Sequence, residues 1–242
     1  MHKGKVMSIR NFYFILILLI NTLYASENSY VNIPCSEYKI GTVSVKFMRG
    51  QGVESNIKET VVAKKDNQIT LKTVTKNKIY NMEQITTILT YLFESNGTIY
   101  SSGEEINNGG FIMKNKNIPD VPICGKVPTL FQYRTVSDSS MPSNDSIPQM
   151  RQTVKIHKIG NKKIKIQAGG FDAEVFQRNT KIEVLNIKNA ALTKVASTQY
   201  YVNKLGLIKQ KNTSVLSMPV NDLIAMSKIQ KNTVLIELVS YK

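Results

Sequence analysis

Apolar and polar residues alternate along much of the chain with a period of two. Val43, Val45 and Phe47 are separated by polar residues, and Ile164 and Ile166 alternate with lysines. Because successive side chains of a β-strand point to opposite faces of a sheet, this pattern predicts half-buried strands with one apolar and one wet face. The chain is therefore expected to be mainly β-sheet.

Short turn signals separate the predicted strands. Each of three dipeptides lies between two neighbouring predicted strands: Asn96-Gly97, Gly160-Asn161 and Asp66-Asn67. Gly, Asn and Asp favour the backbone geometry of tight reversals, so an antiparallel hairpin is predicted at each of these places. In the C-terminal segment 234–239, one face is apolar and the other is apolar except for Glu237. This predicts a strand in the middle of the sheet or against a helix rather than at an exposed edge.

Helical signals are few. They occur at 81–93 and at 220–228, where Asn221 could cap a short helix. The first segment is rich in Thr and Ile, so a strand remains the alternative there. The stretch 137–148 combines Ser, Asp, Asn and two prolines, which predicts an exposed loop that could carry binding residues. The expected fold class is all-β with at most one or two short helices.

The first 25 residues have the pattern of a secretory signal peptide. Three basic residues precede an unbroken apolar run at 12–20, and small residues follow near Ala25. The run is shorter than the roughly 20 apolar residues that a membrane-spanning helix needs. We expect cleavage after Ala25, with Ser26 as the alternative last residue of the signal. Residues 26–242 are then expected to form a single β-rich domain.

The chain is strongly basic, with a formal net charge of +15. Loss of residues 1–25 removes three positive charges and leaves +12. Basic surfaces attract nucleic acid, anionic lipid and acidic polysaccharide. Only five of the 32 basic residues are arginine and the lysines are dispersed, so no nucleic-acid partner is expected. Lysine clusters near 114–116, 162–165 and 204–211 could contact an anionic membrane. The alternative is abundant lysine from an A+T-rich coding sequence, without a specific partner.

Two cysteines, Cys35 and Cys124, lie beyond the signal peptide. An oxidising compartment permits them to pair. We predict a disulfide that closes a loop of about 90 residues and stabilises the fold by roughly 4 to 5 kcal/mol in the chain-entropy model.

Catalytic and metal-binding patterns are missing from the sequence. One histidine, His157, follows the signal peptide, so a Ser-His-Asp or Cys-His site has a single candidate base. Glu104 and Glu105 are adjacent and point to opposite faces of an extended strand. The known phosphate-loop, dinucleotide and zinc-protease motifs do not occur. No enzyme activity, cofactor or metal is expected, although a carboxylate pair from distant strands stays open.

Two segments of the C-terminal half resemble exported bacterial proteins of the TapB-like group. The segment Lys-Ile-Gln-Ala-Gly-Gly-Phe-Asp-Ala at 165–173 is similar to the Pro-Ala-Gly-x-Phe turn of that group, and 200–209 is similar to its Tyr-x-Val-x-Gly-x-Gly-Leu-Val-Lys segment. Gln167, Gly170 and Leu205 depart from the group's pattern. The resemblance implies a strongly curved antiparallel sheet, or half-barrel, shaped like the lipoprotein carriers of the periplasm. The motif residues are expected to specify the fold rather than to contact a ligand, and they are Ala168, Gly169, Gly170, Phe171, Tyr200, Tyr201, Gly206 and Lys209.

The sequence is compatible with three functions. The leading hypothesis is a non-enzymatic carrier of the bacterial periplasm that binds a lipid, an acyl chain or a lipoprotein on the concave face of its sheet, with lysines assisting peripheral membrane contact. The alternative is a structural or protein-interaction module of the cell envelope that uses sheet edges or the 137–148 loop. An enzyme acting on envelope polysaccharide or lipid is the least favoured.

Overall fold

The computed structural model describes residues 29–50, 53–77, 85–139, 149–185, 192–217 and 230–242. These residues form thirteen β-strands and no helix. The described residues include no helix that is long and apolar enough to cross a membrane. The strands are β1 (Tyr30–Ile33), β2 (Val43–Gly50), β3 (Val53–Lys65), β4 (Gln68–Asn77), β5 (Ile85–Phe93), β6 (Ile99–Asn108), β7 (Phe111–Pro128), β8 (Leu130–Ser139), β9 (Met150–Ile166), β10 (Gly169–Val184), β11 (Leu192–Val202), β12 (Gly206–Ser217) and β13 (Gln230–Tyr241).

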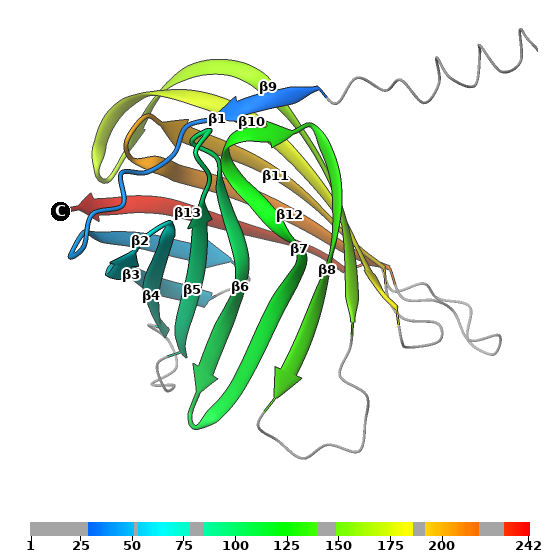
Figure 1. The fold of residues 1–242 in the computed structure, drawn as a ribbon. Coiled ribbons are helices and arrows are strands. Elements are labelled where there is room, and N and C mark those ends of the chain that lie inside the picture. The colour runs from blue at the N-terminus through cyan, green and yellow to red at the C-terminus, as the bar shows by residue number, and fades with distance from the viewer. Residues whose placement is uncertain (1–28, 51–52, 78–84, 140–148, 186–191, 218–229) are drawn as a thin grey trace, which may run out of the picture.

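The strands β2 to β13 form a closed antiparallel barrel (Figure 1). Each strand pairs with its neighbours in sequence, and β13 pairs with β2. The long strand β7 pairs with β6 on one side, and on the other side its N-terminal part pairs with β8 and its C-terminal part with β1. The all-β prediction is confirmed, but the sheet closes instead of stopping at a half-barrel. Closure gives each strand from β2 to β13 a partner on both sides over at least part of its length, so the barrel wall has no edge strand.

Two of the three predicted hairpins are confirmed. Asn96-Gly97 turns the chain between β5 and β6, and Asp66-Asn67 turns it between β3 and β4. The hairpin predicted at Gly160-Asn161 is wrong, because β9 continues through this dipeptide and the chain reverses at 167–168 instead. The glycine marks a β-bulge: the cross-strand register shifts beside it, and its φ of 153° is a conformation that favours glycine.

The segments with helical signals are not described as helices. Residues 85–93 are strand β5, as the β-branched Thr and Ile composition favours, whereas 78–84 and 220–228 lie outside the described residues. Of the loop predicted at 137–148, the first three residues end β8 and 140–148 lie outside the described part of the chain. The prediction for the last strand is confirmed, since β13 lies between β12 and β2.

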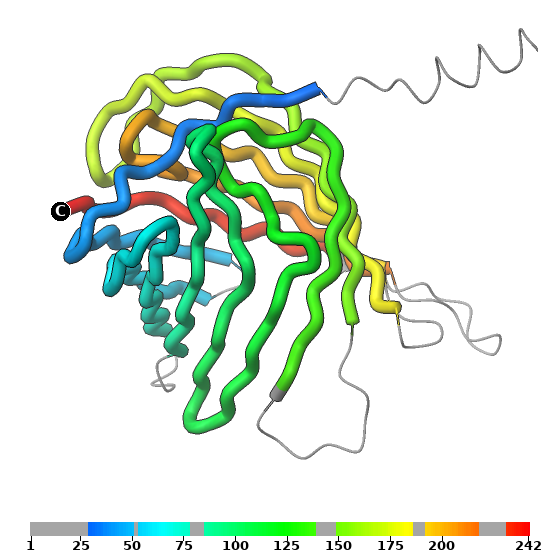
Figure 2. Tube along the Cα trace, in the orientation of Figure 1, coloured from blue at the N-terminus to red at the C-terminus, as the bar shows by residue number. Residues whose placement is uncertain are grey.

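The β9–β10 hairpin extends beyond the neighbouring strands (Figure 2). Pairing of β10 with β11 begins at Glu174, so the tip of the hairpin has no β11 partner. The tip packs against the ends of β12 and β13 in a small apolar cluster formed by Ile166, Ala173, Ile208 and Leu238. The curled hairpin therefore covers part of one end of the barrel.

The main apolar core lies at the barrel end that β1 crosses. Its buried members come from six strands, and Phe176, Val127 and Val154 have no exposed surface. A smaller cluster of Val61, Ile69 and Leu71 lies on β3 and β4. These clusters fill part of the barrel interior with the protein's own side chains. A cavity remains beside the main core, and Tyr201 belongs to both.

The apolar side chains of β2 face outward, although an alternating pattern normally places the apolar residues toward the interior. Ser44 and Lys46 line the interior cavity, so the alternating residues Val43, Val45 and Phe47 lie on the outer face. The interior accepts these polar groups because the carboxylate of Glu59 on β3 receives hydrogen bonds from both the serine hydroxyl and the lysine ammonium.

Candidate functional site

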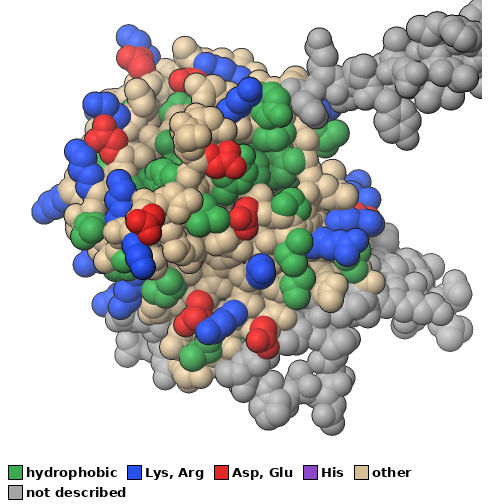
Figure 3. All heavy atoms as spheres, viewed as in Figure 1, with side chains coloured by type: hydrophobic (Ala, Val, Ile, Leu, Met, Phe, Trp, Pro, Cys, Tyr) green, Lys and Arg blue, Asp and Glu red, His purple; other side chains and the backbone are tan. Residues whose placement is uncertain are grey.

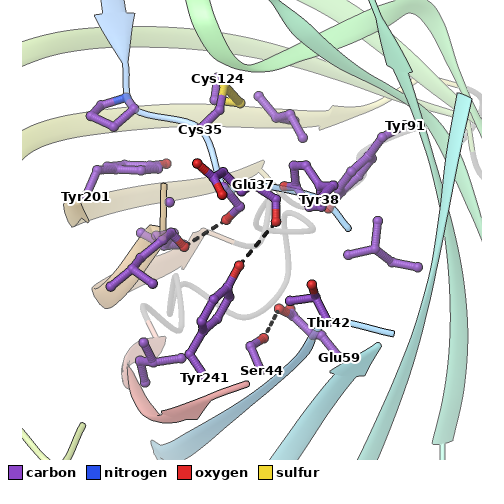
Figure 4. Close-up of a pocket in the computed structure, with 18 of the residues that line it drawn as sticks. Cys35, Glu37, Tyr38, Thr42, Ser44, Glu59, Tyr91, Cys124, Tyr201 and Tyr241 are labelled. Carbon is purple, nitrogen blue, oxygen red and sulfur yellow. Dashed lines mark hydrogen bonds between the residues drawn. A yellow bond between two sulfur atoms is a disulfide. The ribbon is translucent and has the colours of Figure 1, made fainter. Parts of the chain in front are cut away.

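A cavity of about 270 Å³ lies in the barrel interior beside the segment that joins β1 to β2 (Figure 4). It is close to the lower end of the range of small-molecule sites, which run from about 300 to 1,000 Å³. Apolar and polar side chains both contribute to its surface. The lining residues are Pro34, Cys35, Ser36, Glu37, Tyr38, Thr42, Ser44, Lys46, Glu59, Val61, Leu71, Tyr91, Ile123, Cys124, Arg178, Gln199, Tyr201, Leu205, Gly206, Leu207, Leu238 and Tyr241.

One wall of the cavity is the β1–β2 segment (residues 34–42), which runs from the barrel end into β2. The predicted disulfide is confirmed: Cys35 of this segment is bonded to Cys124 of β7. Ser36 Oγ donates a hydrogen bond to the Leu205 carbonyl oxygen at 2.7 Å, and the Glu37 amide donates to the Lys204 carbonyl oxygen at 2.8 Å. The segment is therefore attached to opposite parts of the barrel on either side of the cavity.

The C-terminal strand holds the same segment from below in Figure 4. The Tyr241 hydroxyl donates a hydrogen bond to the Glu37 carbonyl oxygen at 3.1 Å. The Glu37 side chain forms ion pairs with Lys39 and Lys204 at 3.2 and 3.3 Å, and their hydrogen bonds hold the pKa of this carboxyl below its usual range. These contacts fix the backbone of the wall, while the ion pairs themselves are exposed and contribute little stability.

The polar wall of the cavity lies on β2 and β3. Lys46 Nζ lies 2.7 Å from Glu59 Oε2, and Ser44 Oγ donates to the same oxygen at 2.9 Å. The side chains of this ion pair are only 16% and 24% exposed, so water screens the pair less than it screens the surface pairs. The pair neutralises itself and leaves this wall polar but without net charge.

Tyrosines form the sides of the cavity. Tyr38 packs edge-to-face on Tyr91, with ring centroids 5.8 Å apart, and Tyr201 packs edge-to-face on Phe176 at 5.6 Å. Burial raises the pKa of Tyr201 to about 12, against the opposing effect of the positive charge of Arg178. Burial also raises the pKa of Tyr38 and of Tyr91 well above the usual value. These tyrosines are neutral at physiological pH and offer apolar rings with polar hydroxyl groups.

The two sequence motifs meet at this end of the barrel. Ala168 and Phe171 from the hairpin and Tyr200 from β11 are half-buried against the Ile166 cluster, while Gly170 at the turn is exposed. Gly169 has a φ of 133°, as the tight reversal requires. Lys209 forms an ion pair with Glu237 at 2.6 Å. These motif residues lie outside the cavity lining.

Tyr201 and Gly206 are the motif residues that line the cavity. Tyr200 and Tyr201 point in different directions, and the second is both a member of the main core and part of the cavity wall. Gly206 has a φ of 69°, and a Cβ atom at this position would overlap the Ser36 side chain. The glycine is thus required for the close approach between β12 and the β1–β2 segment.

Most of the cavity was not predicted from the sequence. The β1–β2 segment, the Lys46–Glu59 pair, Arg178, Gln199 and Tyr241 carry no local motif, and they come together only because the sheet closes. The available signal is Lys46, a charged residue between Val45 and Phe47 in β2. Glu59 of β3 has no such signal, because it lies among other polar and charged residues.

The described residues contain no group of three or more His, Cys, Asp and Glu side chains arranged to hold a metal ion. His157 is exposed on β9. Glu104 accepts a hydrogen bond from Asn115 at 3.0 Å, whereas the adjacent Glu105 pairs with Lys114 at 3.3 Å. The basic side chains on the face drawn in Figure 3 are dispersed among acidic ones instead of forming a single patch.

Comparisons with known proteins give only distant similarities in structure. No family model matches the chain, and no curated protein matches its sequence. The solved structure of a candidate lipoprotein from Parabacteroides distasonis has a TM-score of 0.38 and 12% identity, covering 88% of this chain and all of the other. A candidate exported protein of Bacteroides fragilis with a YmcC-like fold has a TM-score of 0.41 and 9% identity over the same shares. The resemblance to the TapB-like group stays a prediction.

Proposed function

We propose that the protein is an exported, non-enzymatic binding protein that holds a small single-chain amphiphile in the barrel cavity. The observation that carries the proposal is the cavity itself, closed on one side by the disulfide-anchored β1–β2 segment. A preformed concave site with mixed apolar and polar walls is the usual form of a small-molecule site. The disulfide also supports export, because such bonds persist in oxidising compartments.

The size of the cavity limits the ligand. A methylene group fills about the same volume as a water molecule, about 30 Å³, so roughly nine such groups fill the space. A short acyl chain with a polar head group matches this volume. The proposal therefore narrows the carrier hypothesis to one acyl chain held in the cavity.

The closed barrel favours this function over recognition of a protein partner through sheet edges. Each strand from β2 to β13 has a partner on both sides within the barrel wall. Among the described barrel strands, the protruding tip of the β9–β10 hairpin keeps an unpaired edge, so strand addition is limited to that short segment and to β1. The dispersed lysines supply a basic surface for peripheral contact with anionic membranes, which is the second part of the proposal.

Native mass spectrometry tests the proposal on protein purified from its own cells without detergent. We expect a reproducible small-molecule adduct. The variant Thr42→Phe fills the cavity and should lose the adduct, because Thr42 points into the cavity while its backbone is fixed by hydrogen bonds to Lys39 and Val61. The matched control is Thr70→Phe, which lies on the outer face of β4 between the buried residues Ile69 and Leu71. An adduct retained by Thr42→Phe would contradict the proposal.

A further inference from the structure

The wall of the cavity on β10 and β11 carries a guanidinium group that points into the barrel. Arg178 of β10 is paired across the sheet with Ile156 of β9 and Ser197 of β11. Those two residues are buried, with 1% and 4% of their surface exposed. Directly paired residues of an antiparallel sheet point to the same side, so Arg178 also faces the interior, and it lines the cavity.

The guanidinium has no anionic partner within the described part of the chain. No hydrogen bond or ion pair joins it to another described residue. Its Cζ lies 6.0 Å from the centroid of the Phe131 ring, and its charge acts on the hydroxyl groups of Tyr133 and Tyr201. The nearby Gln199 accepts a hydrogen bond from the Tyr201 hydroxyl through Oε1 at 3.3 Å, which leaves its amide nitrogen available as a donor. Two side chains on adjacent strands thus offer donors to the same space.

The other charges of the cavity are already compensated. Glu59 is paired with Lys46, and Glu37 is paired with Lys39 and Lys204. The remaining charge of the lining is the positive charge of Arg178. A partly buried cation without a counter-ion is unfavourable, and an incoming anion offsets this cost through charge-assisted hydrogen bonds.

We propose that Arg178, together with the amide of Gln199, binds the anionic head group of the amphiphile, a carboxylate or a phosphate. This inference rests on the proposed function and adds the chemical class of the ligand. The planar guanidinium matches both head groups in a two-pronged geometry. Figure 4 shows Tyr201 on one side of the cavity and Tyr38 with Tyr91 on the other, so the apolar tail lies toward the tyrosine pair and Leu71.

The test is an NMR titration of the ¹⁵N-labelled mature protein with octanoate, octyl phosphate and 1-octanol. These three share one tail and differ in the head group. We compare the wild type with Arg178→Met and Arg178→Lys. Loss of a hydrogen-bonded charge pair should weaken octanoate or octyl phosphate binding about 10- to 100-fold in Arg178→Met, with partial recovery in Arg178→Lys. Octanol binding should change little, which also shows that the variant is folded.

The outcomes separate the two proposals. The anion that binds the wild type more tightly identifies the head group as carboxylate or phosphate. Equal weakening of octanol and of the anions in Arg178→Met, or no weakening at all, overturns the role of Arg178 and leaves the binding function standing. If none of the three compounds binds the wild type, both proposals are wrong.

Discussion

Removal of the Cys35–Cys124 disulfide should destabilise the barrel by several kcal/mol. The two cysteines are separated by 89 residues. The chain-entropy model gives about 15.5 cal/mol/K for a loop of this length, which is about 4.6 kcal/mol at 25 °C. The bond joins the β1–β2 segment to β7, so in the unfolded chain it restricts the whole region from β1 to β7. That restriction, more than any contact in the folded state, is the source of the expected stabilisation.

Urea unfolding followed by circular dichroism measures this effect in the double variant Cys35→Ala/Cys124→Ala. With a slope of about 2 kcal/mol/M, the midpoint should fall by about 2 M. The wild type unfolded under reducing conditions provides the control and should match the variant. The hydrogen bonds of Ser36, Glu37 and Tyr241 remain, so the cavity wall should stay in place in the folded variant. An unchanged midpoint in both experiments would refute the loop-closure reasoning.

Three further predictions concern the core residue Phe176, the buried Tyr201, and the close contact between Gly206 of β12 and the β1–β2 segment. Phe176→Ala removes a side chain with no exposed surface and should lower the free energy of unfolding by about 3–5 kcal/mol, measured by chemical unfolding; a loss below 1 kcal/mol would show that the site collapses. Tyr201 has a folded pKa of about 12 against the ordinary 10.0, so its contribution to stability is complete below pH 10 and is lost as the pH rises to about 12. Ultraviolet titration of the folded wild type and of Tyr201→Phe should show no difference in tyrosinate near pH 10, and ionisation of this tyrosine there would contradict the burial argument. Gly206→Ala should cost at least about 1–3 kcal/mol, because it combines a φ of 69° with overlap of Ser36; an unchanged melting temperature would argue against the close approach.

The sequence predicts the local features of this fold well where one residue type dominates the geometry. Asn96-Gly97 forms a hairpin because its glycine takes a positive φ in a tight turn. The two cysteines pair because they are the available partners for each other. The last strand lies within the sheet, as its mainly apolar residues at 234–239 predict. The turn and strand predictions need only neighbouring residues, and the disulfide prediction follows because only two cysteines occur in the sequence.

Closure of the sheet limits what local patterns reveal. In β2 the polar residues Ser44 and Lys46 face the interior, since β3 supplies Glu59 as a partner from the adjacent strand. Alternation alone does not distinguish the inner face from the outer face of such a strand. Local sequence was also insufficient at Gly160, because a Gly-Asn dipeptide suits a turn and a β-bulge equally well. The structure shows a bulge, since β10 pairs with β9 on both sides of this glycine.

The candidate site could not be predicted from local sequence patterns either. Its residues come from the β1–β2 segment and from strands on all sides of the barrel, with no common spacing in the sequence. The sequence around Arg178 does not indicate which side of the sheet this residue faces. Its pairing with the buried residues Ile156 and Ser197 places it on the inner side.

The central claim is that the cavity binds a small amphiphile, and a titration with 1-octanol tests it most directly. This neutral ligand is independent of the proposed anion contact. NMR titration of the wild type, Thr42→Phe and Thr70→Phe should give saturable one-to-one binding in the wild type and in Thr70→Phe, with shifts at the cavity residues, and no binding in Thr42→Phe. The absence of saturable binding in the wild type, or equal binding in all three proteins, would contradict the account.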